Sequence, residues 1–120
     1  MADNQETVGR GQLSVVSTET DGITVLGLRG EVDYQSVGAL TRAMPAADPE
    51  GRRVVVDMSG VTFMDSSGVN ALIAAHQAMQ GAHWWLRLAG VRGAVLRTVQ
   101  VVGLDTLVGC HATVEAAIGG

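Results

Sequence analysis

Lysine is absent from the chain, and cysteine, proline and aromatic residues are scarce. The single cysteine, Cys110, cannot form an internal disulfide, which favours a protein of a reducing compartment. With two Trp, one Tyr and one Phe, the core must be built mainly from aliphatic side chains. No apolar run is long enough for a transmembrane helix, and the N-terminus lacks the basic and apolar segments of a secretory signal. We therefore expect a soluble, cytoplasmic protein without membrane contact.

The rest of the composition is typical of a folded domain. Of 120 residues, 47% are hydrophobic and 17% are charged, which suits one packed core. The net charge of −4 and the lack of an arginine-rich stripe argue against a nucleic-acid partner. Residues 1–11 are polar and contain glycine, so we predict a flexible N-terminal tail there and a single domain over residues 12–120.

Strands and helices are predicted to alternate along the chain. Runs rich in β-branched residues predict strands over residues 13–18, 23–29, 53–58 and 83–89, with a short last strand over 106–108. Apolar residues at helical spacing predict helices over residues 36–44, 69–80, 94–102 and 113–118. Asp21-Gly22 predicts a hairpin between the first two strands, and the later alternation requires crossovers and parallel pairing. The expected fold is α/β with a small mixed sheet, in which the valines at 54–56 mark a central strand covered on both faces.

The most unusual stretch lies between this valine strand and the next helix. Residues 61–70 read VTFMDSSGVN and place an acid, two hydroxyls and a glycine at the helix start. Asp and Ser are preferred N-cap residues and glycine permits close packing, so a plain helix start is the default explanation. One cap needs only one such residue, however, and here Asp65, Ser66 and Ser67 stand in a row beside Gly68. This surplus makes Ser66 a candidate for a function beyond capping.

Catalysis by Ser66 would require a base and an orienting acid within hydrogen-bond reach. His76, His83 and His111 lie on a predicted helix, a strand and a terminal loop, and the G-x-S-x-G elbow is absent. Neither phosphate-binding glycine motif occurs, and Cys110 beside His111 has no further residues at metal-ligand spacing. We expect no catalytic residue, cofactor or metal, and keep a serine hydrolase as a minor alternative.

Two acids, Glu31 and Asp33, follow the second predicted strand. They are ordinary loop residues unless the loop at Gly30 lies beside Ser66. The carboxyl ends of parallel strands can face one edge of a sheet, which would bring these two loops together.

In three ordered segments the chain resembles the STAS-domain anti-sigma factor antagonists of bacterial stress and sporulation control. The segments are residues 63–68 (FMDSSG) after the valine strand, residues 28–33 (LRGEVD), and residues 102–104 (VGL) at a helix end. The resemblance covers residues 13–118, with departures at Val69-Asn70, where relatives usually have Leu-Gly, and at Gly93, where proline is common. It implies the STAS fold, a small mixed β-sheet with helices packed largely on one face.

The resemblance also implies a function. Such a protein is not an enzyme; it binds an ATP-dependent anti-sigma factor serine kinase and so releases the sigma factor. Ser66 corresponds to the phosphoacceptor, phosphorylation by that kinase inactivates the antagonist, and a phosphoserine phosphatase restores it. The expected partner-binding residues are Asp33, Asp65, Ser66, Ser67 and Gly68. The alternative is a STAS subunit of a transporter, such as a lipid-asymmetry transporter, or of a stressosome-type scaffold.

A helix N-terminus offers free N–H groups and a partial positive charge, so it can hold a phosphate without distortion. A phosphoserine adds about −1.5 to −2 charges at pH 7. We therefore predict that phosphorylation of Ser66 changes the fold little and acts by placing bulk and charge where the kinase docks.

Overall fold

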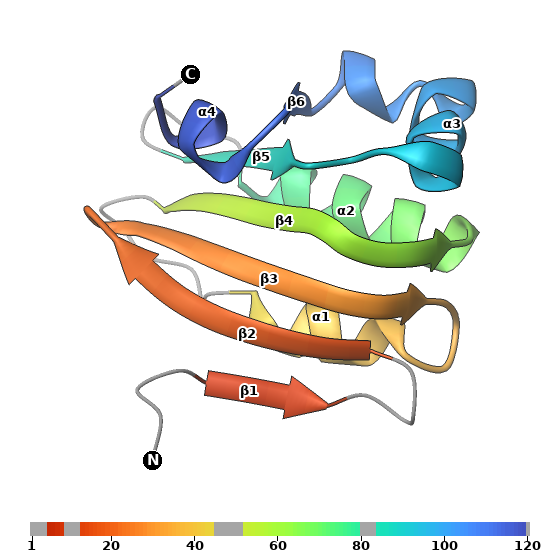
Figure 1. The fold of residues 1–120 in the computed structure, drawn as a ribbon, viewed down its shortest axis with the longest axis horizontal. Helices are drawn as coiled ribbons and strands as arrows, with labels where there is room; N and C mark the ends of the chain where they lie inside the picture. Colours follow the sequence, from red (N-terminus) through yellow and green to blue (C-terminus); the bar gives the residue numbers. More distant parts are fainter. Residues whose placement is uncertain (1–4, 9–12, 45–51, 80–83, 120) are drawn as a thin grey trace.

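The computed structural model describes residues 5–8, 13–44, 52–79 and 84–119. Within these ranges one six-stranded sheet has the strand order β1-β2-β3-β4-β5-β6, so each strand neighbours the next one in sequence (Figure 1). The strands are β1 (Gln5–Val8), β2 (Leu13–Thr20), β3 (Ile23–Val32), β4 (Arg53–Met64), β5 (Trp85–Ala89) and β6 (Gly109–His111). The helical elements are α1 (Val37–Ala43), α2 (Ser66–Ala78), α3 (Gly93–Val102), the 3₁₀ turn η1 (Leu104–Thr106) and α4 (Val114–Gly119).

The sheet is mixed, as the sequence predicted. Strands β1, β2 and β3 pair antiparallel, whereas β3, β4, β5 and β6 pair parallel. A two-residue turn joins β2 to β3, and both of its residues have positive φ, 53° at Asp21 and 77° at Gly22. These angles match the turn type that suits a two-residue hairpin, so the predicted hairpin is confirmed.

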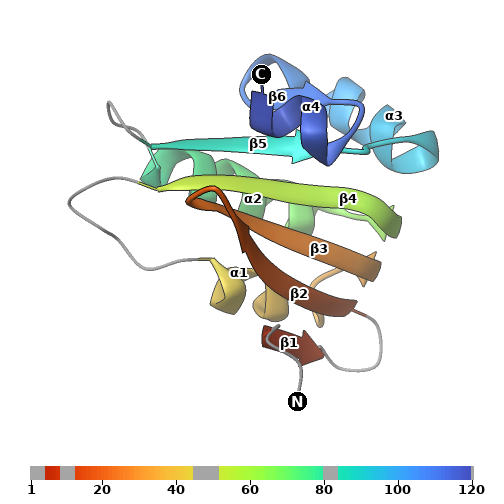
Figure 2. The same ribbon diagram turned by 60° about the vertical axis from the view of Figure 1, so that its left-hand side comes forward.

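The helices lie mainly on one face of the sheet. The larger core cluster joins residues of β2, β3, β4 and β5 to α1, α2 and α3, including Leu40, Leu72 and Val99. A smaller cluster on the opposite face centres on Ile23, Val55 and Ala117, and there α4 covers β4 and β5. Figure 2 shows this arrangement, with α1 and α2 behind the sheet and α4 in front. The predicted packing of helices largely on one face is confirmed.

Strand β4 is central and has both faces covered at its start. Val54, Val55 and Val56 are all 0% exposed, with Val54 and Val56 in the larger cluster and Val55 in the smaller one. The valine run therefore has the position that the sequence predicted, because alternate side chains of a strand enter opposite layers.

Strand β4 continues to Met64, well past the predicted end at residue 58. Its pairing with β3 shifts register twice, and each shift adds one residue to β4. The buried residues Met58, Val61 and Met64 are consequently spaced by three, so the two-residue period of a strand is lost in the sequence. At the first shift a Cβ on Gly60 would lie 2.7 Å from the Leu28 carbonyl oxygen, which only glycine avoids.

Other element limits also differ from the predictions. Helix α2 begins at Ser66 and not at Val69, because the polar residues before Val69 supply its cap and first turn. The last strand lies at Gly109–His111 and not at residues 106–108, because Leu104–Thr106 form a 3₁₀ turn and Val108 is buried.

Residues 5–8 form β1 inside the segment expected to be a flexible tail, since the edge of β2 offers unpaired backbone groups for an antiparallel strand. Two expected features fall outside the described residues: the end of the predicted helix at Gln80 and the start of the predicted strand at His83. Among the helices of the described ranges, none combines the length and the apolar character needed to cross a membrane.

Candidate functional site

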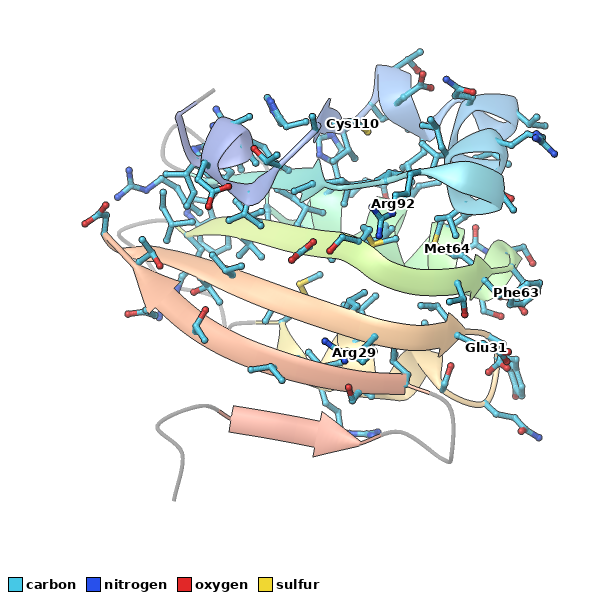
Figure 3. All side chains as sticks on the ribbon, in the orientation of Figure 1. Arg29, Glu31, Phe63, Met64, Arg92 and Cys110 are labelled. Atoms are coloured by element: carbon cyan, nitrogen blue, oxygen red, sulfur yellow. The ribbon has the colours of Figure 1, made fainter. Side chains whose placement is uncertain are left out.

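The loops after β3 and β4 meet at one edge of the sheet, as the sequence predicted. In the parallel pairing Val32 lies opposite Met64, and the next residue, Asp65, donates its backbone N–H to the Val32 carbonyl oxygen at 3.1 Å. This bond joins the start of the Asp33 loop to the N-terminus of α2. Figure 3 shows Glu31, Phe63 and Met64 near this end of the two strands.

Asp65 is the N-cap residue of α2. Its Oδ1 accepts a hydrogen bond from the Ser67 backbone N–H at 2.8 Å, and its carbonyl oxygen accepts from the Val69 N–H at 3.2 Å. A carboxylate at this position also opposes the partial positive charge of the helix N-terminus. The Asp65 carboxylate therefore already binds one of the helix N–H groups that we had expected to be free for a phosphate.

Gly68 allows α2 to approach the sheet closely. It is buried in the first turn, and a Cβ there would lie 2.5 Å from Met64 Cγ and 2.8 Å from Val32 Cγ1. Any larger residue must push the helix or the strand ends apart. Gly68 thus has a packing role and offers a partner no side-chain surface.

The two serines of the junction differ in exposure. Ser66, the first residue of α2, is exposed, whereas Ser67 is half-buried and has its backbone N–H bound by Asp65. Within the described ranges, the Ser66 hydroxyl has no hydrogen-bond partner. Its Oγ is therefore open to an incoming reactant.

Asp33 organises its own turn between β3 and α1. Its Oδ1 accepts hydrogen bonds from the backbone N–H groups of Gln35 at 3.0 Å and Ser36 at 2.9 Å. Ser36, 1% exposed, completes the turn: its hydroxyl donates to the Glu31 carbonyl oxygen at 2.8 Å and accepts from the Asp33 N–H at 2.9 Å. The structure thus brings Asp33 to the edge where Ser66 lies and gives the Asp33 carboxylate a structural task there.

Two aromatic residues at this edge were missed as site candidates. Tyr34, in the Asp33 turn, is 83% exposed, and Phe63, opposite Glu31 in the strand pairing, is 48% exposed. The signal was present in the sequence, because both are among the few aromatic residues of the chain and stand among polar residues. An exposed aromatic side chain in such a position is typical of a contact surface.

The edge is acidic. The carboxylates of Glu31, Asp33 and Asp65 belong to the two loops and the strand ends, and Glu31 is exposed. Arg29 and Arg92 lie further back along the sheet from Phe63 and Glu31 (Figure 3). Arg92 Nη2 donates to the Ser59 carbonyl oxygen at 3.1 Å, which holds this cation away from the strand ends.

Among the described residues, no histidine lies beside Ser66 to act as a base. His76 lies ten residues further along α2, about 15 Å at the helical rise per residue, and His111 lies on β6. The described part of the chain also contains no group of three His, Cys, Asp or Glu residues able to hold a metal ion. The chemistry open to this edge is modification of an exposed hydroxyl and contact with a partner.

A protein-family model described as "Mlab, STAS domain" matches residues 16–109, most of the chain. The chain belongs to the STAS domain family. The predicted resemblance to anti-sigma factor antagonists is thereby confirmed at the level of family and fold.

The individual relatives share less than 30% of their residues with this chain. The chain is 27% identical over 110 residues to the anti-sigma-F factor antagonist RsfB of Mycobacterium tuberculosis, covering 90% of this chain and 88% of the relative. The solved structure of an anti-sigma factor antagonist from Mycobacterium paratuberculosis superposes with a TM-score of 0.78 at 23% identity, covering 94% of this chain and 97% of the other. A sulfate transporter family protein from Wolinella succinogenes superposes with a TM-score of 0.67 at 16% identity, covering 85% and 86% of the two chains.

Proposed function

We propose that this STAS protein is an anti-sigma factor antagonist that works by partner switching in the cytoplasm. Unphosphorylated, it binds an ATP-dependent anti-sigma factor serine kinase, and the sigma factor held by that kinase is released. The kinase inactivates it by phosphorylating Ser66, and a phosphoserine phosphatase restores it. The protein itself has no catalytic role in this cycle.

One observation carries the proposal. At the start of α2, Asp65 caps the helix by accepting a hydrogen bond from the Ser67 N–H, and Gly68 packs on the sheet. The Ser66 side chain, in contrast, is exposed and makes no hydrogen bond within the described residues. An exposed hydroxyl that makes no hydrogen bond to the described fold is accessible to a protein kinase. The antagonist relatives support the choice of partner.

The chemical step is a phosphoryl transfer from ATP. A bond forms between Ser66 Oγ and the γ-phosphorus while the bond from that phosphorus to the β–γ bridging oxygen breaks. ADP leaves, and the hydroxyl proton passes to a base of the kinase. The phosphatase reverses the modification by transferring the phosphoryl group to water, which regenerates the Ser66 hydroxyl and releases inorganic phosphate.

The position of Ser66 explains why the phosphate would act on the partner and not on the fold. The side chain projects outward from the first turn of α2, so about −1.5 to −2 charges can be added without displacing a core residue. Asp65 already occupies the Ser67 N–H, so the phosphate competes with a carboxylate for the helix N-terminus. We expect it to remain at the surface, where it obstructs docking.

The test is to mix the protein with each candidate anti-sigma kinase and ATP, and to locate the added phosphoryl group by mass spectrometry. We expect one phosphoryl group on wild type, none on Ser66→Ala, and one on the neighbouring control Ser67→Ala. Equal labelling of wild type and Ser66→Ala would disprove the assignment of the acceptor. If no candidate kinase binds wild type, the function itself is wrong.

The second candidate function is that of a STAS subunit in a transporter or scaffold. The description of the matching family model and the structural likeness to a sulfate transporter family protein favour it. Affinity capture distinguishes the two, because this alternative predicts recovery of transporter ATPase subunits in place of a sigma-regulating kinase.

A further inference from the structure

The large hydrophobic side chains that are exposed in the described residues lie in two regions of the fold. Tyr34 and Phe63 lie at the Ser66 edge, where β3 and β4 end. The others are on α3 and after η1, on the β5–β6 side of the sheet: Val101, Val102 and Leu107. We call Tyr34 and Phe63 the aromatic pair.

The aromatic pair is held by rigid backbone. Tyr34 lies in a turn whose next two N–H groups are bound by Asp33 Oδ1, and the buried Ser36 hydroxyl closes that turn against β3. Phe63 stands on the bulged end of β4, opposite Glu31. Because the backbone is already ordered, a partner that binds these rings loses little further backbone entropy.

We infer that the aromatic pair provides the main apolar contacts for the anti-sigma factor kinase, an inference that rests on the proposed function. A kinase that transfers phosphate to Ser66 Oγ must bring its nucleotide to this edge. A standard interface buries about 800 Å² of each partner, so its footprint extends beyond Ser66 to the neighbouring loops. Tyr34 and Phe63 are on those loops and strand ends, whereas α3 presents its valines elsewhere.

The charges indicate what the kinase surface must offer. Glu31 is exposed beside Phe63, and Figure 3 places Arg29 and Arg92 further back along the sheet. A surface that fits this edge combines an apolar groove for two rings with a cationic rim opposite Glu31. The phosphates of the bound nucleotide lie opposite Ser66 itself. A phosphoserine at this position is therefore repelled by their negative charge, and its added bulk obstructs docking.

The test is to measure the kinase affinity of single variants in the presence of ADP, so that no transfer occurs. Tyr34→Ser and Phe63→Ser remove the rings. The matched controls are Val101→Ser and Leu107→Ser, because these residues are 80% and 52% exposed against 83% for Tyr34 and 48% for Phe63. We expect each ring removal to weaken binding at least about tenfold and each control to stay within about twofold of wild type.

Three further measurements distinguish a lost contact from a loss of folding and test whether charge steers the association. Tyr34→Phe keeps the ring and should restore binding to within about threefold of wild type, while thermal unfolding should show that every variant remains folded. Glu31→Lys should slow association and reduce its dependence on salt, because it reverses the charge that faces the cationic rim of the kinase.

The outcomes are distinct. If wild type is phosphorylated on Ser66 and both ring variants bind as wild type, the docking inference is wrong and the proposed function stands. If wild type neither binds nor is labelled by any anti-sigma kinase, the proposed function fails and the docking inference fails with it. If the ring variants abolish self-association in sedimentation without changing kinase affinity, the aromatic pair joins two copies of this chain and the inference is overturned.

Discussion

Gly68 and Gly38 lie in the first turns of α2 and α1, and the structure predicts opposite effects when each is changed to alanine. A Cβ at Gly68 meets Met64 Cγ at 2.5 Å and Val32 Cγ1 at 2.8 Å, and both of these side chains are buried. The three atoms nearest to a Cβ at Gly38 all belong to the Arg42 guanidinium, with Nη1 at 2.9 Å, and Arg42 is exposed and can move aside.

The magnitudes follow from two opposing terms. In a helix, alanine is favoured over glycine by up to about 1 kcal/mol. Overpacking a close-packed core costs about 1–3 kcal/mol, and Val32 has little freedom to move because its side chain is β-branched. We therefore expect Gly68→Ala to lower the free energy of unfolding by about 1 kcal/mol and Gly38→Ala to raise it by up to about 1 kcal/mol, since only the propensity term acts there.

Urea unfolding and calorimetry on the two variants measure this difference, and a change of 1 kcal/mol should shift Tm by about 4 °C. A double variant, Gly68→Ala with Val32→Ala, tests the contact itself: part of the clash is removed, so the combined loss should be smaller than the sum of the two single losses. If Gly68→Ala stabilises the protein as Gly38→Ala does, then α2 does not pack on Met64 and Val32 as described, and the position assigned to Ser66 is also wrong.

Three further predictions concern the same edge and the single thiol. Asp65→Ala should lower the free energy of unfolding by about 1 kcal/mol through loss of the bond to Ser67 N–H, while Asp65→Asn, which can still cap, should lose little; equal losses would contradict the capping role. Asp33→Ala should speed amide hydrogen exchange at Gln35 and Ser36, and unchanged exchange at both would contradict the turn. Burial, with a further contribution from the Asp105 carboxylate, raises the pKa of the Cys110 thiol, so less thiolate is present at neutral pH. Iodoacetamide should therefore alkylate Cys110 more slowly in the folded protein than in the urea-unfolded chain at pH 7.5, the two rates should converge as pH rises, and Asp105→Asn should speed the folded reaction.

Much of the fold could be predicted from the sequence because the relevant signals are local. The Asp21-Gly22 turn, the buried valine run and the alternation of strands with helices each depend on residues close together in the chain. The same holds for the helix start at residues 65–68, where Asp and Ser are residue types preferred as caps. The prediction that the Asp33 and Ser66 loops share an edge also held, because parallel strands place their carboxyl ends together.

The sequence alone misplaced features that depend on contacts between distant residues. The two register shifts of β4 extend it to Met64, and they exist only in relation to β3. The β1 strand likewise forms only because β2 presents an edge to it. Local sequence patterns do not predict such pairing, because the partner residues lie elsewhere in the chain.

The sequence by itself determined most of the order of elements, because periodicity, capping and turn chemistry act over a few residues. The family and the candidate acceptor Ser66 came from the resemblance of three short segments to the antagonists, and the acceptor role stays a prediction. Only the tertiary structure decided which residues of the junction are already used. It assigned Asp65 to the cap, Gly68 to close packing and Asp33 to its own turn, and it left Ser66, Tyr34 and Phe63 at the surface. Burial and hydrogen bonding are properties of the assembled sheet and helices, so they become visible only when distant segments are in contact.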